Sequence, residues 1–160
     1  MPYVLLLLAL ILPLPEATGP NPVLRFAPAY APAPDEDLSG IWVGKLYQDA
    51  GGIAEQFEFS VQIRQVGPAI KGTTFVQLDD IWAEMAFSGY RQPNGSWKLT
   101  EYEVIRAQKP AALSWCMKRL ELVLNYTDEG MVLTGPWWGN SEFGPCVPGS
   151  VRLHRKANRV

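Results

Sequence analysis

The sequence has few of the residues that catalytic and metal sites require. Its 160 residues include one histidine and two cysteines, with no Cys-x-x-Cys pair. No Ser–His–acid or Cys–His arrangement is apparent around the single histidine, His154. No glycine-rich phosphate-binding motif leads into a helix. We therefore expect no catalytic residues, no metal site and no bound cofactor.

Neither sign of charge dominates the chain. The net charge is −2, and from Leu38 onward 13 Lys and Arg residues stand against 12 Asp and Glu residues. A nucleic-acid-binding domain needs a basic patch or stripe, so no nucleic-acid partner is expected. The hydrophobic fraction of 48% is too high for a disordered chain and fits one folded domain.

No apolar run is long enough to span a membrane as a helix. The longest, at residues 4–14, has 11 residues, which is the length of a secretory h-region and shorter than the ~20 residues of a spanning helix. We expect a signal-peptide-like leader over residues 1–18, a Pro-rich linker or tail over residues 19–37, and no membrane span in the mature protein. The predicted localisation is therefore exported: periplasm, envelope or medium. An apolar N-terminal segment of a cytosolic protein is the alternative.

The two cysteines, Cys116 and Cys146, form an even and minimal set. In an exported chain such a pair indicates one disulfide. Closing a loop of ~30 residues would stabilise the fold by ~3–4 kcal/mol in the chain-entropy model. Two buried free thiols are the alternative.

Beyond residue 37 the apolar residues recur with a period of two, which is typical of strands with one buried face. Turn residues separate eight such segments, at residues 41–48, 56–66, 70–78, 81–91, 97–106, 115–126, 131–138 and 150–156. Sequential antiparallel strands close most naturally into a barrel, which removes exposed edges. We predict an all-β domain over residues 38–157 that forms an eight-stranded antiparallel up-and-down barrel, with a two-sheet β-sandwich as the second choice.

The segment from Leu38 to Trp42, with its Gly-x-Trp pattern, resembles the start of the first strand in lipocalins and their calycin relatives. In that superfamily this tryptophan closes one end of the barrel, and a basic residue of the last strand packs across it. The resemblance therefore implies that Arg155 makes a cation–π contact with Trp42. The region from Gly135 to Cys146 also resembles uncharacterised exported bacterial domains, a likeness that carries no assigned activity.

Alternation along two of the predicted strands places charges inside the barrel. If Trp97 points inward, Glu101 and Glu103 follow it, and Lys118 lies on the inward face of the next strand. Buried charges must be paired, so we expect these residues to pair with one another or with Arg155. A structural ion pair near the rim, or a bulge that turns the glutamates outward, is the alternative.

A ligand pocket would lie at the end of the barrel away from Trp42. Glu101, Glu103 or Lys118 would orient the ligand as rim charges, so that Lys118→Met would spare the fold. The predicted apolar wall comes from inward-facing residues of several strands: Phe59, Val61, Met85, Phe87 and Leu122.

Three functions are consistent with this pattern. The first is an exported, non-enzymatic binding domain for a small apolar or amphipathic ligand. The second is a protein-interaction or structural module of the cell envelope, whose barrel is filled and whose partner is another envelope protein. The third is an enzyme that uses Glu101 or Glu103. The volume left inside the barrel separates the first from the second.

Overall fold

The structure is a computed structural model that describes residues 36–157, whose regular secondary structure consists of β-strands alone. The leader predicted at residues 1–18 lies outside the described residues, as does the linker predicted at 19–37 apart from its last two residues. The strands are β1 (Gly40–Gln48), β2 (Gln56–Val66), β3 (Ala69–Leu78), β4 (Ile81–Arg91), β5 (Trp97–Gln108), β6 (Met117–Thr127), β7 (Gly130–Ser141), β8 (Gly144–Pro145) and β9 (Gly149–Arg155). Within residues 36–157, no helix is long and apolar enough to cross a membrane.

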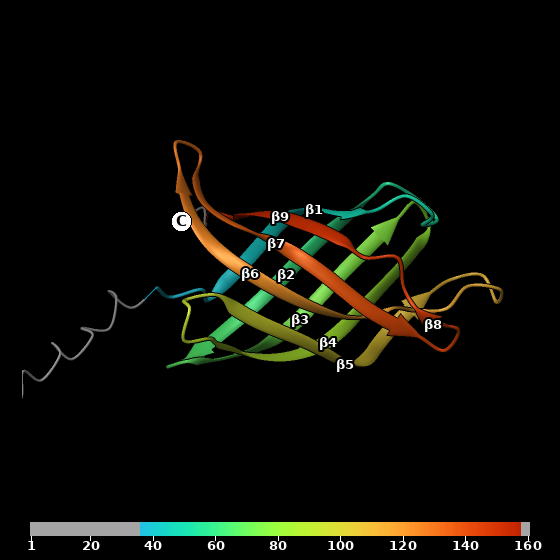
Figure 1. The fold of residues 1–160 in the computed structure, drawn as a ribbon, viewed down its shortest axis with the longest axis horizontal. Helices are drawn as coiled ribbons and strands as arrows, with labels where there is room; N and C mark the ends of the chain where they lie inside the picture. Colours follow the sequence, from blue (N-terminus) through green and yellow to red (C-terminus); the bar gives the residue numbers. More distant parts are fainter. Residues whose placement is uncertain (1–35, 158–160) are drawn as a thin grey trace, which may run out of the picture. The chain divides into compact units, whose positions relative to one another are not determined.

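Eight of the strands close into an antiparallel up-and-down barrel (Figure 1). Strands β1 to β7 pair with their neighbours in sequence, and β9 closes the circle by pairing with both β7 and β1. The two-residue β8 is an addition that pairs with the end of β7. The predicted barrel is therefore confirmed, and the sandwich is excluded.

The strands form because apolar and polar residues alternate at the period of the pleat. In β2, Phe59, Val61 and Ile63 are buried inside the barrel, while Glu58 and Gln62, which alternate with them, point outward and are exposed. The predicted bounds of β2 and β4 match the structure, and most of the other strand ends differ by one or two residues.

The two ends of the barrel differ in their connections. The β2–β3, β4–β5 and β6–β7 connections are short turns, and Gly95 in one of them has a φ of +87°, which favours glycine. These turns lie at the end that holds Trp42, called the closed end below. The longer connections, residues 49–55, 109–116 and 142–148, all lie at the opposite end, called the open end (Figure 1).

Large side chains fill the barrel from the closed end to its middle. The largest that are fully buried are Trp42, Trp97, Phe87, Leu38, Met85, Leu99, Leu120, Leu122, Leu133 and Leu153. At the closed end the indole N–H of Trp42 donates to the carbonyl of Leu38 at 2.8 Å. The guanidinium of Arg155, paired with Trp42 in the sheet, lies 5.8 Å from the centre of its ring and donates to the Ser39 carbonyl. This arrangement seals one end of the interior.

Strand β5 is irregular in its second half. Phe87 on β4 is opposite Glu101, but Ala86 is opposite Glu103, so that Tyr102 has no partner between them. A second register shift leaves Ile105 without a partner, because Met85 is opposite Val104 and Glu84 is opposite Arg106. Such bulges bend a strand and increase its twist.

Just before these bulges, at Thr100, the pairing of β5 with β6 ends. The register between the two strands covers only Trp97–Thr100 of β5, opposite Arg119–Leu122 of β6. The remainder of β5 is held by β4 alone, and residues 102–108 are exposed. The wall of the barrel therefore parts toward the open end, and residues 109–116 connect its two sides.

Candidate functional site

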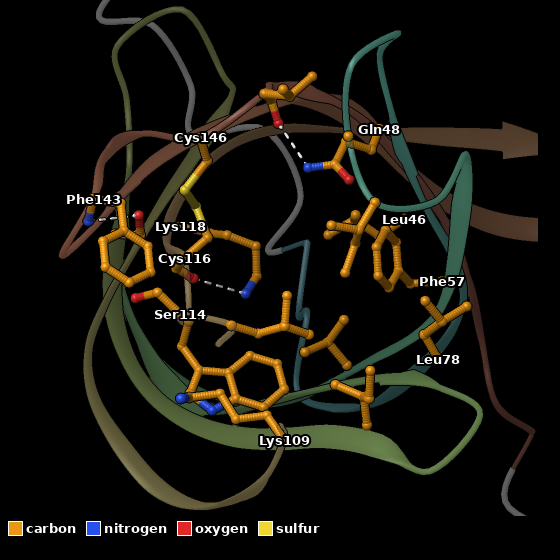
Figure 2. Close-up of a pocket in the computed structure, with 18 of the residues that line it drawn as sticks. Leu46, Gln48, Phe57, Leu78, Lys109, Ser114, Cys116, Lys118, Phe143 and Cys146 are labelled. Carbon is orange, nitrogen blue, oxygen red and sulfur yellow. Dashed lines mark hydrogen bonds between the residues drawn. A yellow bond between two sulfur atoms is a disulfide. The ribbon is translucent and has the colours of Figure 1, made fainter. Parts of the chain in front are cut away.

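A pocket of about 300 Å³ lies at the open end of the barrel (Figure 2). Trp42 and Arg155 do not line it, so the pocket lies at the end away from Trp42. This is the end at which a ligand pocket was predicted. Its walls come from the inner faces of several strands and from all three long connections. The arrangement of tight turns at one end and long loops at the other therefore sets the position of the pocket.

Most of the pocket wall is apolar. The strands contribute Leu46, Phe57, Val76, Leu78, Ile81 and Trp137. Trp137 is fixed because its indole N–H donates to the carbonyl of Tyr47 at 2.8 Å, across the sheet. Phe143, which is 75% exposed, stands at the rim on the β7–β9 connection. An apolar ligand would replace water against this wall, which is the main source of affinity in small-molecule sites.

Lys118 is the charged group at the base of the pocket, and it forms an ion pair with Glu101. Its Nζ lies 3.0 Å from Oε2 of Glu101, and both side chains are almost completely buried. Glu101 also accepts a hydrogen bond from the Thr74 hydroxyl at 2.5 Å and one from the backbone N–H of Lys118 at 2.7 Å. The carboxylate thus has three donors, which a buried charge requires.

The ammonium group of Lys118 points into the pocket (Figure 2). Besides Glu101, it donates to the carbonyl of Cys116 at 3.3 Å and lies 3.5 Å from the sulfur of Met85. A thioether is a weak acceptor, so one of the three ammonium protons is poorly satisfied. A ligand oxygen would be a stronger partner for that proton.

Lys118 was expected to be a rim charge whose replacement spares the fold, and that prediction is wrong. The residue is only 4% exposed and is paired with a carboxylate that is itself buried. Replacing Lys118 alone would leave Glu101 without its counter-charge in the interior, a change that is strongly destabilising.

Glu103 does not face the interior, which contradicts the predicted inward pair of glutamates. The unpaired Tyr102 in β5 shifts the alternation by one residue, so that Glu101 points inward and Glu103 is exposed. A one-residue shift moves every following side chain to the other face of a strand. The carboxylates of these two residues therefore do not meet at one site.

The predicted apolar wall lies deeper than the pocket. Phe59, Met85, Phe87 and Leu122 are buried in the packed core, as is Val61, and none of them lines the pocket. Phe59 and Met85 lie directly beneath the site, because both are in contact distance of the Lys118 ammonium. The predicted wall residues lie too deep in the barrel, because the inward face of each strand continues toward the open end. On β2 this face reaches the pocket at Phe57.

A disulfide joins Cys116 and Cys146 at the mouth of the pocket, as predicted (Figure 2). Their Cα atoms are 6.3 Å apart, and both residues line the pocket. The bond ties the connection that precedes β6 to the connection between β7 and β9. Two of the three long loops are therefore held together at the position where β5 and β6 have separated.

Sequence reasoning missed Leu46, Phe57 and Trp137, which line the pocket. Leu46 shares the inward face of β1 with Trp42, and Phe57 shares that of β2 with Phe59. Extending both faces to the strand ends nearest the long loops would have identified them. Gln48 and the loop residues carry no such signal, because their positions depend on the fold of the connections.

In the part of the chain that the structure describes, no group of three or more His, Cys, Asp and Glu side chains could hold a metal ion. His154 lies on the outer side of β9, with its Nδ1 4.0 Å from a carboxylate oxygen of Glu129. Comparisons of the chain with models of known protein families, with curated proteins and with solved structures found no match.

Proposed function

We propose that this protein is an exported, non-enzymatic binding domain for a compact amphipathic molecule with an apolar body and an anionic head. The observation that supports this most directly is the apolar pocket at the open end with the buried ammonium group of Lys118 at its base. The resemblance of the Gly40–Trp42 segment to lipocalins agrees with this proposal, because barrels of eight strands commonly hold one small ligand.

The size of the pocket favours a compact ligand. Its volume of about 300 Å³ is at the lower limit of the ~300–1,000 Å³ typical of small-molecule sites. The core beneath it is packed, so the cavity does not continue toward Trp42. A short acyl chain or a single ring fits such a space better than a long-chain lipid or a haem-like compound.

The charges around the pocket favour an anion. Among residues 36–157, the charged residues that line it are Lys109 and Lys118, and none is Asp or Glu. Glu101 forms an ion pair with Lys118, but its carboxylate is buried and does not line the pocket. An anionic head would therefore meet two cationic groups, and it would supply the acceptor that one Lys118 proton lacks.

The arrangement of Glu101 argues against an enzyme. Its carboxylate is fully buried, accepts three hydrogen bonds and does not line the pocket. A general acid or base must reach the proton that it transfers. The same groups that stabilise the charge of Glu101 thus keep it from a bound molecule.

Export rests on the disulfide together with the apolar segment at residues 4–14. A structural disulfide indicates an oxidising compartment, because cytosolic thiols are kept reduced. The leader and the disulfide are independent features of the chain, and both point to the same localisation.

The alternative function, an envelope protein-interaction module, is favoured by one feature of the surface. The irregular half of β5 exposes Tyr102, Val104 and Ile105, and within the described residues it pairs with no strand on the β6 side. An exposed strand edge with apolar side chains can accept a strand from another protein. The filled core agrees with either function.

Titration with octanoate and with 1-octanol would test the proposed function. Trp115 and Trp137 line the pocket, so their fluorescence should report saturable binding. We expect octanoate to bind more tightly than octanol. Lys109→Met should weaken only octanoate, by several-fold, and Lys71→Met on the exposed surface of β3 is the matched control.

Replacement of the buried pair as a unit, with Glu101→Gln and Lys118→Met, provides the second variant. It removes both charges without leaving one unpaired, and it should reduce the preference for octanoate, with Lys109 as the remaining cationic group. A folded protein that shows no saturable binding to either compound would overturn the proposal and favour the interaction module.

A further inference from the structure

Gln48 is a neutral polar residue that lines the pocket on the wall opposite the β6 side. Gln48 is the last residue of β1, and its Nε2 donates to the carbonyl of Val147 at 3.2 Å (Figure 2). This hydrogen bond fixes the orientation of the amide, because a carbonyl accepts only from the NH₂ side. The oxygen of Gln48 is therefore the atom of this pocket-lining side chain that is left without a partner.

That oxygen is buried and unsatisfied. Oε1 of Gln48 has no hydrogen-bond partner within residues 36–157. Unpaired buried acceptors are rare in folded proteins, because each one loses its hydrogen bond to water without a replacement. Lys118 presents the complementary case, since one of its protons faces only the sulfur of Met85.

The backbone keeps the Gln48 amide in this position. Gly52, on the β1–β2 connection, lies directly against the Gln48 side chain, and a Cβ atom at Gly52 would collide with the amide. The absence of a side chain at this position leaves room for the amide beside the loop. Gln48 is thus held from one side by Val147 and from the other by the backbone of Gly52.

We propose that Gln48 is a second anchor of the site and that the ligand carries a hydrogen-bond donor in addition to its anionic head. This inference rests on the proposed function and narrows its ligand class to compact hydroxylated monocarboxylates, or carboxylates with an N–H donor. Lys118 donates to the carboxylate, and Gln48 Oε1 accepts from the hydroxyl. A site with a donor at one wall and an acceptor at another fixes the orientation of a ligand between them.

The test compares octanoate with hydroxyoctanoates that carry the hydroxyl beside the carboxylate, in the middle of the chain or at its far end. Dissociation constants are measured by calorimetry and by tryptophan fluorescence. A neutral hydrogen bond changes affinity by ~2- to 10-fold, so at least one hydroxyoctanoate should bind about fivefold more tightly than octanoate. The position of the favoured hydroxyl reports its separation from the carboxylate in the site.

Gln48→Met keeps the length of the side chain and should remove that gain, so that this variant binds the favoured hydroxyoctanoate and octanoate with affinities within about twofold of each other. Gln56→Met, an exposed change at the same end of the barrel that does not line the pocket, is the control and should keep the gain. Retention of the gain in Gln48→Met, or no gain for any hydroxyoctanoate when octanoate itself binds, would overturn the inference and leave the proposed function standing. No binding of any of these compounds would overturn both.

Discussion

Removing Glu101 tests how the charge at the base of the pocket is stabilised. In Glu101→Leu the Lys118 ammonium, only 4% exposed, loses the carboxylate 3.0 Å away and keeps the Cys116 carbonyl and the Met85 sulfur as partners. Breaking one side of a buried ion pair costs ~3–5 kcal/mol, because the remaining charge is not compensated. The Thr74 hydroxyl also loses its acceptor, so we expect the upper part of this range.

The double variant Glu101→Leu with Lys118→Met separates the cost of an unpaired charge from the loss of the contact. It removes both charges and keeps the apolar volume, so it should recover more than half of the stability that Glu101→Leu alone loses. Lys118→Met alone should be destabilising by a similar amount, because it leaves Glu101 unpaired at full burial.

The measurement is urea unfolding of all four proteins at neutral pH, with the coupling energy taken from the double-mutant cycle. A cost below about 1 kcal/mol for Glu101→Leu would mean that the pair is hydrated like a surface ion pair. Strict additivity would mean that the two side chains do not stabilise one another. Either result would refute the account of the site given above.

Three other perturbations test the ends of the barrel. Trp42→Ala should lower the free energy of unfolding by ~3–5 kcal/mol through the cavity it leaves, and Arg155→Ala should cost less and couple to it in a double-mutant cycle. Reduction of the Cys116–Cys146 disulfide should cost ~3–4 kcal/mol in thermal or urea unfolding, and peptide mapping of the unreduced protein should recover the linked pair. Hydrogen bonds from Ser39 lower the pKa of Asp37, and the side chain of Ser39 contributes more to this than its backbone N–H. The stabilisation by Asp37 is therefore present above the ordinary value of 3.8 and should be lost as the pH falls below it, so that Asp37→Asn should lose less stability than the unchanged protein over the same range.

The barrel could be predicted from the sequence because strand period and turn chemistry agree along the whole domain. Alternating residues such as those of β2 can bury only one face, and turns such as Asn94-Gly95 return the chain antiparallel. Trp42 and Arg155 are brought opposite one another by the pairing of β1 with β9, which closure of an eight-stranded meander requires. Period and closure together thus predict the barrel, and the resemblance of the Gly40–Trp42 segment to lipocalins predicted which residues meet at its closed end.

The open end was less predictable because its side chains depend on loops. Strand alternation identified Lys118 as an inward residue with Glu101 among its expected partners, but not its depth below the rim, because the pocket mouth is formed by residues 109–116 and the disulfide. Gln48 carries no signal at all, since its amide is fixed by the Val147 carbonyl on a connection far along the chain. Loop conformation has no period that a sequence could display.

The error at Glu103 has the same origin as the pocket itself. The bulge at Tyr102 turns Glu103 outward and, with the bulge that follows it, twists β5 away from β6. If β5 continued its regular pairing, β6 would close that side of the barrel, and residues 109–116 would not need to bridge the gap. The alternating sequence pattern does not reveal this irregularity. It leaves Glu101 as the last inward residue of β5, beside Lys118. It also makes residues 109–116 part of the pocket wall. At this site, therefore, the departure from the strand period places the charges and creates the space for a ligand.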